Sequence, residues 1–172
     1  MNKKNIAIVL AGNIENAPYH AYYTKIFDKV NAEYEIITWD RLSLGAKGTY
    51  CFRYPSPDNL PFYKKLTDFY KFSKFVKKIL SNKKYNYVVV FTLVNIVFLG
   101  KFLIKNYTKR YLIDIRDYSP LLPYLKGKIS NCFYHALQVT VSSVGFIKWL
   151  PAGTEYVLCH NVNYEYLSRS ED

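Results

Sequence analysis

Acidic residues are scarce in this sequence, and it has no internal repeat or low-complexity tract. Thirteen Asp and Glu stand against 24 Lys and Arg, which leaves a formal net charge of +11. Such an excess indicates anionic partners, namely a membrane surface, a nucleic acid or a phosphorylated substrate. Half of the 172 residues are apolar, which is enough for a packed core. Wholesale disorder is therefore excluded, and one domain is predicted.

Cysteine is equally sparse. The sequence has three cysteines, an odd number, and they lie far apart, at Cys51, Cys132 and Cys159. This pattern excludes a disulfide framework and a cysteine-type zinc site, and it is typical of a reducing compartment. The three histidines show no metal-ligand spacing either, so no metal site is predicted.

Long hydrophobic runs are missing. The run Ile6–Ala11 is too short for a signal-peptide core followed by a cleavage site. The stretch Tyr87–Ile104 is interrupted by Thr92, Asn95 and Lys101. A membrane-spanning helix needs about 20 predominantly apolar residues. We therefore interpret this stretch as a buried strand that leads into a buried helix, with a membrane span as the alternative, and we predict a cytoplasmic protein.

What the sequence does contain is a steady alternation of strand and helix patterns. Apolar strands are predicted at 5–11, 34–39, 49–54, 87–91, 111–115, 138–142 and 155–159. Helices are predicted at 18–30, 62–78, 94–104, 124–137 and 145–150. This order predicts an α/β fold, a Rossmann-like, doubly wound and mainly parallel sheet with helices on both faces. Residues 1–164 form the predicted domain, and 165–172 are a polar tail.

Ligands of such sheets bind beyond the carboxyl ends of the strands, which makes the loop after the first strand a candidate site. This loop lacks both the Gly-x-Gly-x-x-Gly spacing and the Lys-Ser/Thr ending of phosphate-binding loops, which disfavours dinucleotides and ATP. Gly12 would still let a ligand approach the backbone closely, beside Asn13. An ordinary strand-to-helix turn is the alternative interpretation.

The cluster Asp114-Ile115-Arg116-Asp117 ends another predicted strand. Alternation places Asp114 and Arg116 on one side of the strand and Asp117 on the other. Charges at the end of a buried strand are costly unless they are paired or face a cleft. An Arg can clamp a phosphate, and an Asp can bind sugar hydroxyls or take up a proton. The alternative is an internal Arg–Asp pair that fixes the strand end.

Other polar residues follow the remaining strands. Ser142 and Ser143 lack a nucleophile-elbow pattern and are predicted to cap the short helix that follows them. His20 lies just inside the first predicted helix, where it can face the cleft. His160 and Asn161 end the last strand and are further binding candidates.

The segment 62–84 interleaves aromatic residues with lysines. This pattern suits an interfacial helix on anionic lipid, and it equally suits an amphipathic helix whose lysines are simply solvated. Nucleic acid is disfavoured because no recognised binding motif accompanies the charge.

Four segments together resemble a known family: Lys4–Leu10, Asp114–Asp117, Val139–Phe146 and Tyr156–Asn163. Their order and spacing resemble the N-terminal domain of bacterial family-four glycosyltransferases of the GT-B fold. Such enzymes build capsule, lipopolysaccharide and related surface polysaccharides. The resemblance implies a transferase that moves a sugar from a nucleotide sugar to a lipid-linked or polysaccharide acceptor.

The resemblance also implies roles for matching positions. The family's fourth main strand commonly ends in His-Asp beside the reacting sugar; Asp117 keeps the Asp, whereas Arg116 departs from the His. Gly12 and Asn13 match a loop near the donor phosphates and the acceptor. The Ser142-Ser143 strand end matches a family Ser that opens the next helix, and the resemblance makes both serines substrate-binding candidates. At the hinge, Asn161-Val162-Asn163 lacks the family's Gly and Asp.

Family members continue with a second domain that binds the nucleotide sugar, and this chain stops near the hinge. The resemblance therefore implies the acceptor-binding half of a transferase, which would transfer little or no sugar alone. No cofactor is expected on this domain, and such transfer generally needs no metal. The implied partners are a donor-binding glycosyltransferase domain and a lipid-linked acceptor at the inner membrane face, where the protein would be peripheral. The alternatives are a non-catalytic Rossmann-like domain for a phosphorylated ligand, or a basic membrane-surface adaptor.

Overall fold

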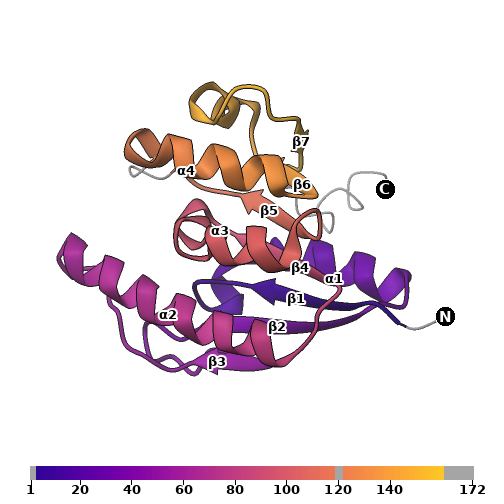
Figure 1. The fold of residues 1–172 in the computed structure, drawn as a ribbon. Coiled ribbons are helices and arrows are strands. Elements are labelled where there is room, and N and C mark those ends of the chain that lie inside the picture. The colour runs from indigo at the N-terminus through magenta and orange to yellow at the C-terminus, as the bar shows by residue number, and fades with distance from the viewer. Residues whose placement is uncertain (1–2, 119–121, 161–172) are drawn as a thin grey trace, which may run out of the picture.

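A seven-stranded parallel sheet forms the centre of the molecule (Figure 1). The computed structural model describes residues 3–118 and 122–160. The strand order is β3-β2-β1-β4-β5-β6-β7, and all six neighbouring pairs are parallel. The strands are β1 (Asn5–Val9), β2 (Glu33–Trp39), β3 (Tyr50–Phe52), β4 (Tyr87–Phe91), β5 (Tyr111–Ile115), β6 (Gln138–Val141) and β7 (Tyr156–Leu158). The Rossmann-like α/β prediction is confirmed.

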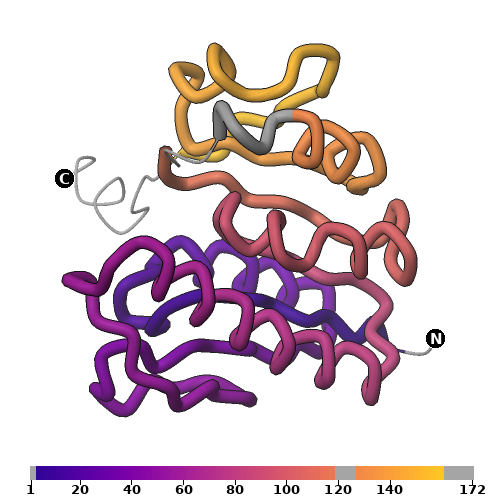
Figure 2. The backbone as a smooth tube through the Cα atoms, turned by 60° about the vertical axis from the view of Figure 1, so that its left-hand side comes forward, coloured from indigo at the N-terminus to yellow at the C-terminus, as the bar shows by residue number. Residues whose placement is uncertain are grey.

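Helices cover both faces of this sheet. They are α1 (His20–Lys29), α2 (Phe62–Asn82), α3 (Leu93–Tyr107) and α4 (Leu122–His135), with 3-10 turns η1 (Ile14–Asn16) and η2 (Val144–Trp149). Figures 1 and 2 show α2, α3 and α4 side by side on one face, with α1 on the other. The predicted tail 165–172 lies outside the described residues.

The alternation of side chains along β1 explains the two layers. Ala7 and Val9 are buried in the core beneath α2, α3 and α4. Ile6 and Ile8 point the other way, into a smaller core with Tyr23 of α1. Because successive strand residues face opposite sides, an apolar run without polar gaps is what a strand covered on both faces requires.

An aromatic cluster joins β2 to α2. The Trp39 side chain is fully buried, and its ring lies 5.3 Å from Phe72 and 5.1 Å from Phe69 between centroids. Its indole N–H donates to the carbonyl of Tyr54, 2.7 Å away. This bond fixes the irregular segment after β3 against the sheet, which positions one wall of the cleft described below.

Close contact between α3 and α4 depends on Gly100. A Cβ at this position would lie 2.3 Å from Cys132 Sγ, which is buried. We expect Gly100→Ala to lower the free energy of unfolding by about 1–3 kcal/mol, because overpacking outweighs the better helix propensity of Ala. Urea denaturation of both proteins would measure the change.

Gly127 of α4 supplies the matched control, because a Cβ there would meet nothing within 4 Å. Gly127→Ala should raise stability by up to about 1 kcal/mol. Equal effects of the two substitutions would contradict the packing role of Gly100.

The apolar stretch 87–104 divides as predicted into a strand and a helix. It forms β4 and most of α3, both packed in the core. Within the described ranges, no helix combines the length and the apolar character that crossing a bilayer requires.

Candidate functional site

A cleft of about 380 Å³ opens at the carboxyl edge of the sheet. It lies where the strand order reverses, because the chain runs from β1 outward to β2 and β3 and then returns to β4 on the other side of β1. Parallel α/β sheets bind ligands at this switch point. The cleft is lined by Leu10, Ala11, Gly12, Asn13, Asn16, Ala17, Tyr19, Arg41, Leu42, Asp58, Phe69, Phe91, Thr92, Leu93, Val94, Asp117 and Tyr118.

The loop after β1 forms the first wall. Gly12 and Asn13 both line the cleft, and the Asn13 side chain is buried. A Cβ on Gly12 would meet nothing within 4 Å, so the cleft side of this backbone is open. An open backbone beside a buried amide can approach and hydrogen-bond a polar ligand closely.

The segment after β5 forms the second wall. Asp117 and Tyr118 are exposed and line the cleft beside Tyr19. Burial raises the pKa of Tyr19 to about 12, and the nearby carboxylates of Asp117 and Asp114 act in the same direction. The Tyr19 hydroxyl therefore stays protonated near neutral pH and can serve as a hydrogen-bond donor next to Asp117.

The third wall comes from the segment after β2 and from α2. Arg41 Nη2 donates to Asp58 Oδ1 at 3.0 Å and to the Ser56 carbonyl at 3.2 Å. Its guanidinium also lies over the rings of Trp39 and Phe69. The cation is thus held in place by packing and by hydrogen bonds, at the rim of the cleft.

Thr92 carries backbone strain at the floor of the cleft. It precedes α3 with φ 71° and ψ 144°, and a β-branched residue with positive φ is an outlier. Such strain costs about 1–3 kcal/mol and collects at functional sites. The residues that follow Thr92, Leu93 and Val94, line the cleft and form the first turn of α3, where backbone N–H groups lack partners within the helix.

A buried ion pair lies behind the cleft. Arg116 Nη2 donates to Asp114 Oδ2 at 2.7 Å, and both side chains are almost completely buried. Tyr23 donates to the same carboxylate oxygen at 2.8 Å. Arg116 Nη1 donates to the Cys159 carbonyl at 3.0 Å, and the guanidinium lies 5.2 Å from the centre of the Tyr19 ring.

This geometry matches the internal-pair alternative for the charged cluster. Desolvation by burial raises the pKa of Asp114, and the Arg116 guanidinium opposes that rise. Because Arg116 is directed at Asp114 and Cys159, it does not line the cleft. Of the two predicted catalytic residues, the structure brings only Asp117 to the cleft.

Four of the remaining predicted residues, His20, Ser142, Ser143 and His160, are not among those that line the cleft. His20 Nδ1 is 2.6 Å from the Ala17 carbonyl, inside the first turn of α1. Ser142 is buried and donates to the Arg116 carbonyl at 3.3 Å. Ser143 Oγ accepts from the Gly145 N–H at 3.2 Å, which confirms the predicted cap for Ser143; the prediction was wrong for Ser142, whose hydroxyl is directed at the Arg116 carbonyl. His160 is exposed, and Asn161 lies outside the described residues.

Several residues at the cleft were not predicted. Arg41 and Thr92 follow the ends of two predicted strands, where ligands of parallel sheets bind, but no motif singles out either residue. Phe69 and Asp58 come from α2 and the segment before it, and no motif marks them. Tyr19 and Tyr118 are two of 18 tyrosines, so their residue type carried little information.

The chemistry of the cleft is that of a polar-ligand site with aromatic walls. Aromatic faces and a few placed polar groups are typical of small-molecule pockets. Within residues 3–118 and 122–160, no three His, Cys, Asp or Glu side chains gather closely enough to hold a metal ion. Comparisons with protein-family models, curated proteins and solved structures find no match to this chain.

Proposed function

We propose that this chain is the acceptor-binding half of a sugar transferase, and that its ligand occupies the cleft at the β1–β4 switch point. The observation that carries the proposal is the convergence of Gly12, Asn13 and Asp117 on one cleft from loops about 100 residues apart in a fold of this class. In the proposed complete enzyme, a nucleotide sugar would be held by a separate donor-binding domain.

The lining suits a sugar. Rings of Tyr19, Phe69 and Tyr118 offer flat apolar surfaces, and a sugar ring has apolar C–H faces. Asp117 and Asn13 can accept hydrogen bonds from hydroxyl groups, and Tyr19 can donate one. Within the proposal, Asp117 orients an acceptor hydroxyl and takes up its proton.

The acceptor would carry phosphate as well as sugar. The N-terminus of α3 faces the cleft, where helix N–H groups favour a negatively charged ligand. We therefore propose a lipid-linked acceptor, with the protein peripheral at an anionic membrane surface. The same feature supports the second candidate, a non-catalytic Rossmann-like domain that binds a phosphorylated ligand.

A transfer assay separates the two candidates. The chain would be incubated with membrane-extracted lipid acceptors and nucleotide sugars, alone and with the product of the neighbouring reading frame. We expect transfer only with that product, and we expect Asp117→Asn to reduce it by about 10²–10⁴-fold through loss of the base.

The matched control is Asp28→Asn, which removes an exposed carboxylate from α1 and should leave transfer unchanged. Transfer by Asp117→Asn at the rate of the unmodified chain would contradict the role of Asp117. Binding of a phosphorylated sugar without any transfer would favour the second candidate.

A further inference from the structure

The positive charge of this chain is concentrated on one side of the sheet. Helices α2, α3 and α4 together contain ten lysines and one acidic residue, which accounts for nine of the eleven net charges. The one acid, Asp68, is buried and bonded to Ser56 and Lys71. The outer surface of these three helices, which we term the three-helix face, is therefore cationic.

A groove of about 210 Å³ lies in the three-helix face where the helices meet. Each helix supplies one lysine to it: Lys77 from α2, Lys101 from α3 and Lys128 from α4. Within the described part of the chain, none of the three forms an ion pair. Between them the groove exposes apolar side chains, among them Val97 and Ile104.

The groove thus combines three unpaired cations with an apolar lining. Burial lowers the pKa of Lys77, which shows that this ammonium group has lost part of its hydration without gaining an anionic partner. An anion seated among the three lysines would compensate for that loss. An apolar group attached to the anion would cover Val97 and Ile104.

We propose that the three-helix face docks on a membrane, with one anionic phospholipid headgroup seated in the groove between Lys77, Lys101 and Lys128. In this arrangement the headgroup phosphate would pair with the ammonium groups, and the adjoining glycerol and first methylenes would cover the apolar lining. The inference rests on the proposed function, in which the protein is peripheral at an anionic membrane. It names the surface that contacts the membrane, which is distinct from the cleft.

The composition of this face favours lipid over nucleic acid. All ten cations of the three helices are Lys and none is Arg. Lys is a compact charge that attracts anionic surfaces diffusely, whereas the Arg fork is preferred for specific nucleic-acid recognition. Exposed aromatic residues also lie along α2, namely Phe62, Tyr63 and Tyr70, and such side chains suit the headgroup region.

Vesicle sedimentation tests the proposal without donor or acceptor. We expect the chain to bind vesicles of equimolar phosphatidylcholine and phosphatidylglycerol, and to bind vesicles of phosphatidylcholine alone far more weakly. The triple variant Lys77→Gln, Lys101→Gln, Lys128→Gln should bind the anionic vesicles about 100-fold more weakly.

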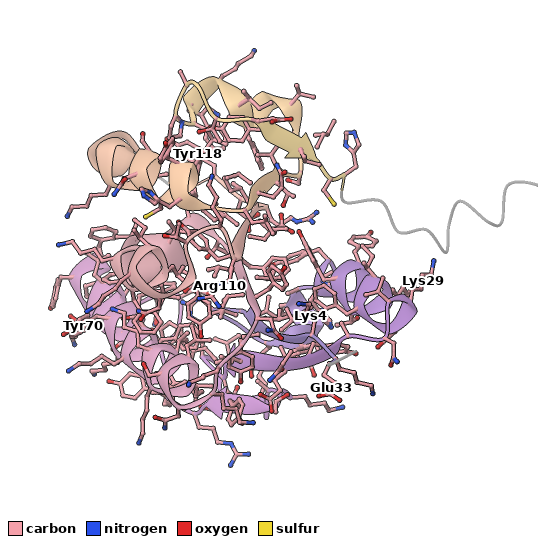
Figure 3. The ribbon with its side chains drawn as sticks, turned by 45° about the vertical axis from the view of Figure 1, so that its right-hand side comes forward. Lys4, Lys29, Glu33, Tyr70, Arg110 and Tyr118 are labelled. Carbon is pink, nitrogen blue, oxygen red and sulfur yellow. The ribbon has the colours of Figure 1, made fainter. Side chains whose placement is uncertain are left out.

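A second triple variant has the same net charge and serves as the control. It is Lys25→Gln, Lys29→Gln, Lys47→Gln, three exposed lysines outside the three-helix face. Figure 3 shows Lys29 on the opposite side of the molecule from Tyr70 of α2. We expect the control to keep binding within about threefold of the unmodified chain, because attraction falls off within about 8–10 Å in physiological salt.

Three outcomes would overturn the proposal: no binding to anionic vesicles, equal losses in both variants, or binding of RNA through these lysines in place of vesicles. Because the assay contains no sugar, failure here would leave the cleft and Asp117 untested. Conversely, if Asp117→Asn abolishes sugar transfer and leaves vesicle binding unchanged, the cleft and the three-helix face have separate roles.

Discussion

Replacing Arg116 by methionine should lower the free energy of unfolding by about 3–5 kcal/mol, because it leaves the buried carboxylate of Asp114 without its cation. The two side chains lie 2.7 Å apart and are 1 % and 0 % exposed, so water cannot take over the role of the guanidinium. Urea or thermal denaturation would measure the loss. Arg53→Met, at an exposed position, should change stability by no more than about 0.5 kcal/mol.

The pH dependence of the Arg116→Met protein gives a second measurement. Without the guanidinium, burial should raise the pKa of Asp114 further above its unfolded value. The folded variant then binds a proton more readily than the unfolded one, so its stability deficit relative to the parent should shrink as the pH falls through that raised pKa.

The double variant Asp114→Asn, Arg116→Met should recover part of the loss, since neither buried charge remains. A single Arg116→Met variant that unfolds like the parent at every pH would contradict the structural role of the pair. Arg116 would then again be a candidate ligand-binding residue.

Replacing Trp39 by alanine should also cost about 3–5 kcal/mol, because it empties the centre of the aromatic cluster between β2 and α2. Trp39 is completely buried and contacts Phe52, Phe69 and Phe72. The cavity would lie behind Phe69, which lines the cleft, so ligand binding should weaken together with stability.

Trp39→Phe separates packing from hydrogen bonding. Phenylalanine keeps an aromatic ring but leaves the Tyr54 carbonyl without its 2.7 Å donor, for an expected loss of about 1–3 kcal/mol. Denaturation followed by the fluorescence of Trp149, the second of the two tryptophans, would report both variants. Losses below about 1 kcal/mol for Trp39→Ala would show that this cluster does not anchor α2.

The sequence predicted the sheet well because its strands are covered on both faces. The predicted bounds of β4 and β5, Tyr87–Phe91 and Tyr111–Ile115, are those observed; β4 is an uninterrupted apolar run, and β5 is apolar except for Asp114. The helix predicted at 62–78 extends to Asn82, because Leu80 packs in the core and its periodicity continues past the lysines. The first helix begins at His20 rather than Pro18. The backbone N–H groups of His20 and Ala21 donate to the carbonyls of Ala17 and Pro18, three residues back, so the intervening turn is of the 3-10 type.

The cleft was predictable only in part. Gly12, Asn13 and Asp117 follow strand ends, and the topology of a parallel sheet brings strand ends together. The direction of the Arg116 side chain was not predictable, because its partner Cys159 lies 43 residues away and burial is a property of the folded chain. The concentration of lysines on one layer likewise appears only once α2, α3 and α4 are seen to share a face.

The position of β1 in the middle of the sheet has a consequence for synthesis on the ribosome. The backbone N–H of Asn5, the first residue of β1, donates to the side-chain oxygen of Asn86, which directly precedes β4 and lies 81 residues later in the chain. At a translation rate of about 5–20 residues per second, β4, the second neighbour of β1 in the sheet, is therefore synthesised about 4–16 seconds after β1. During that interval a highly apolar strand has one edge open, so the nascent chain should depend on early chaperone contact, and its yield should fall when translation is slowed between β2 and β4.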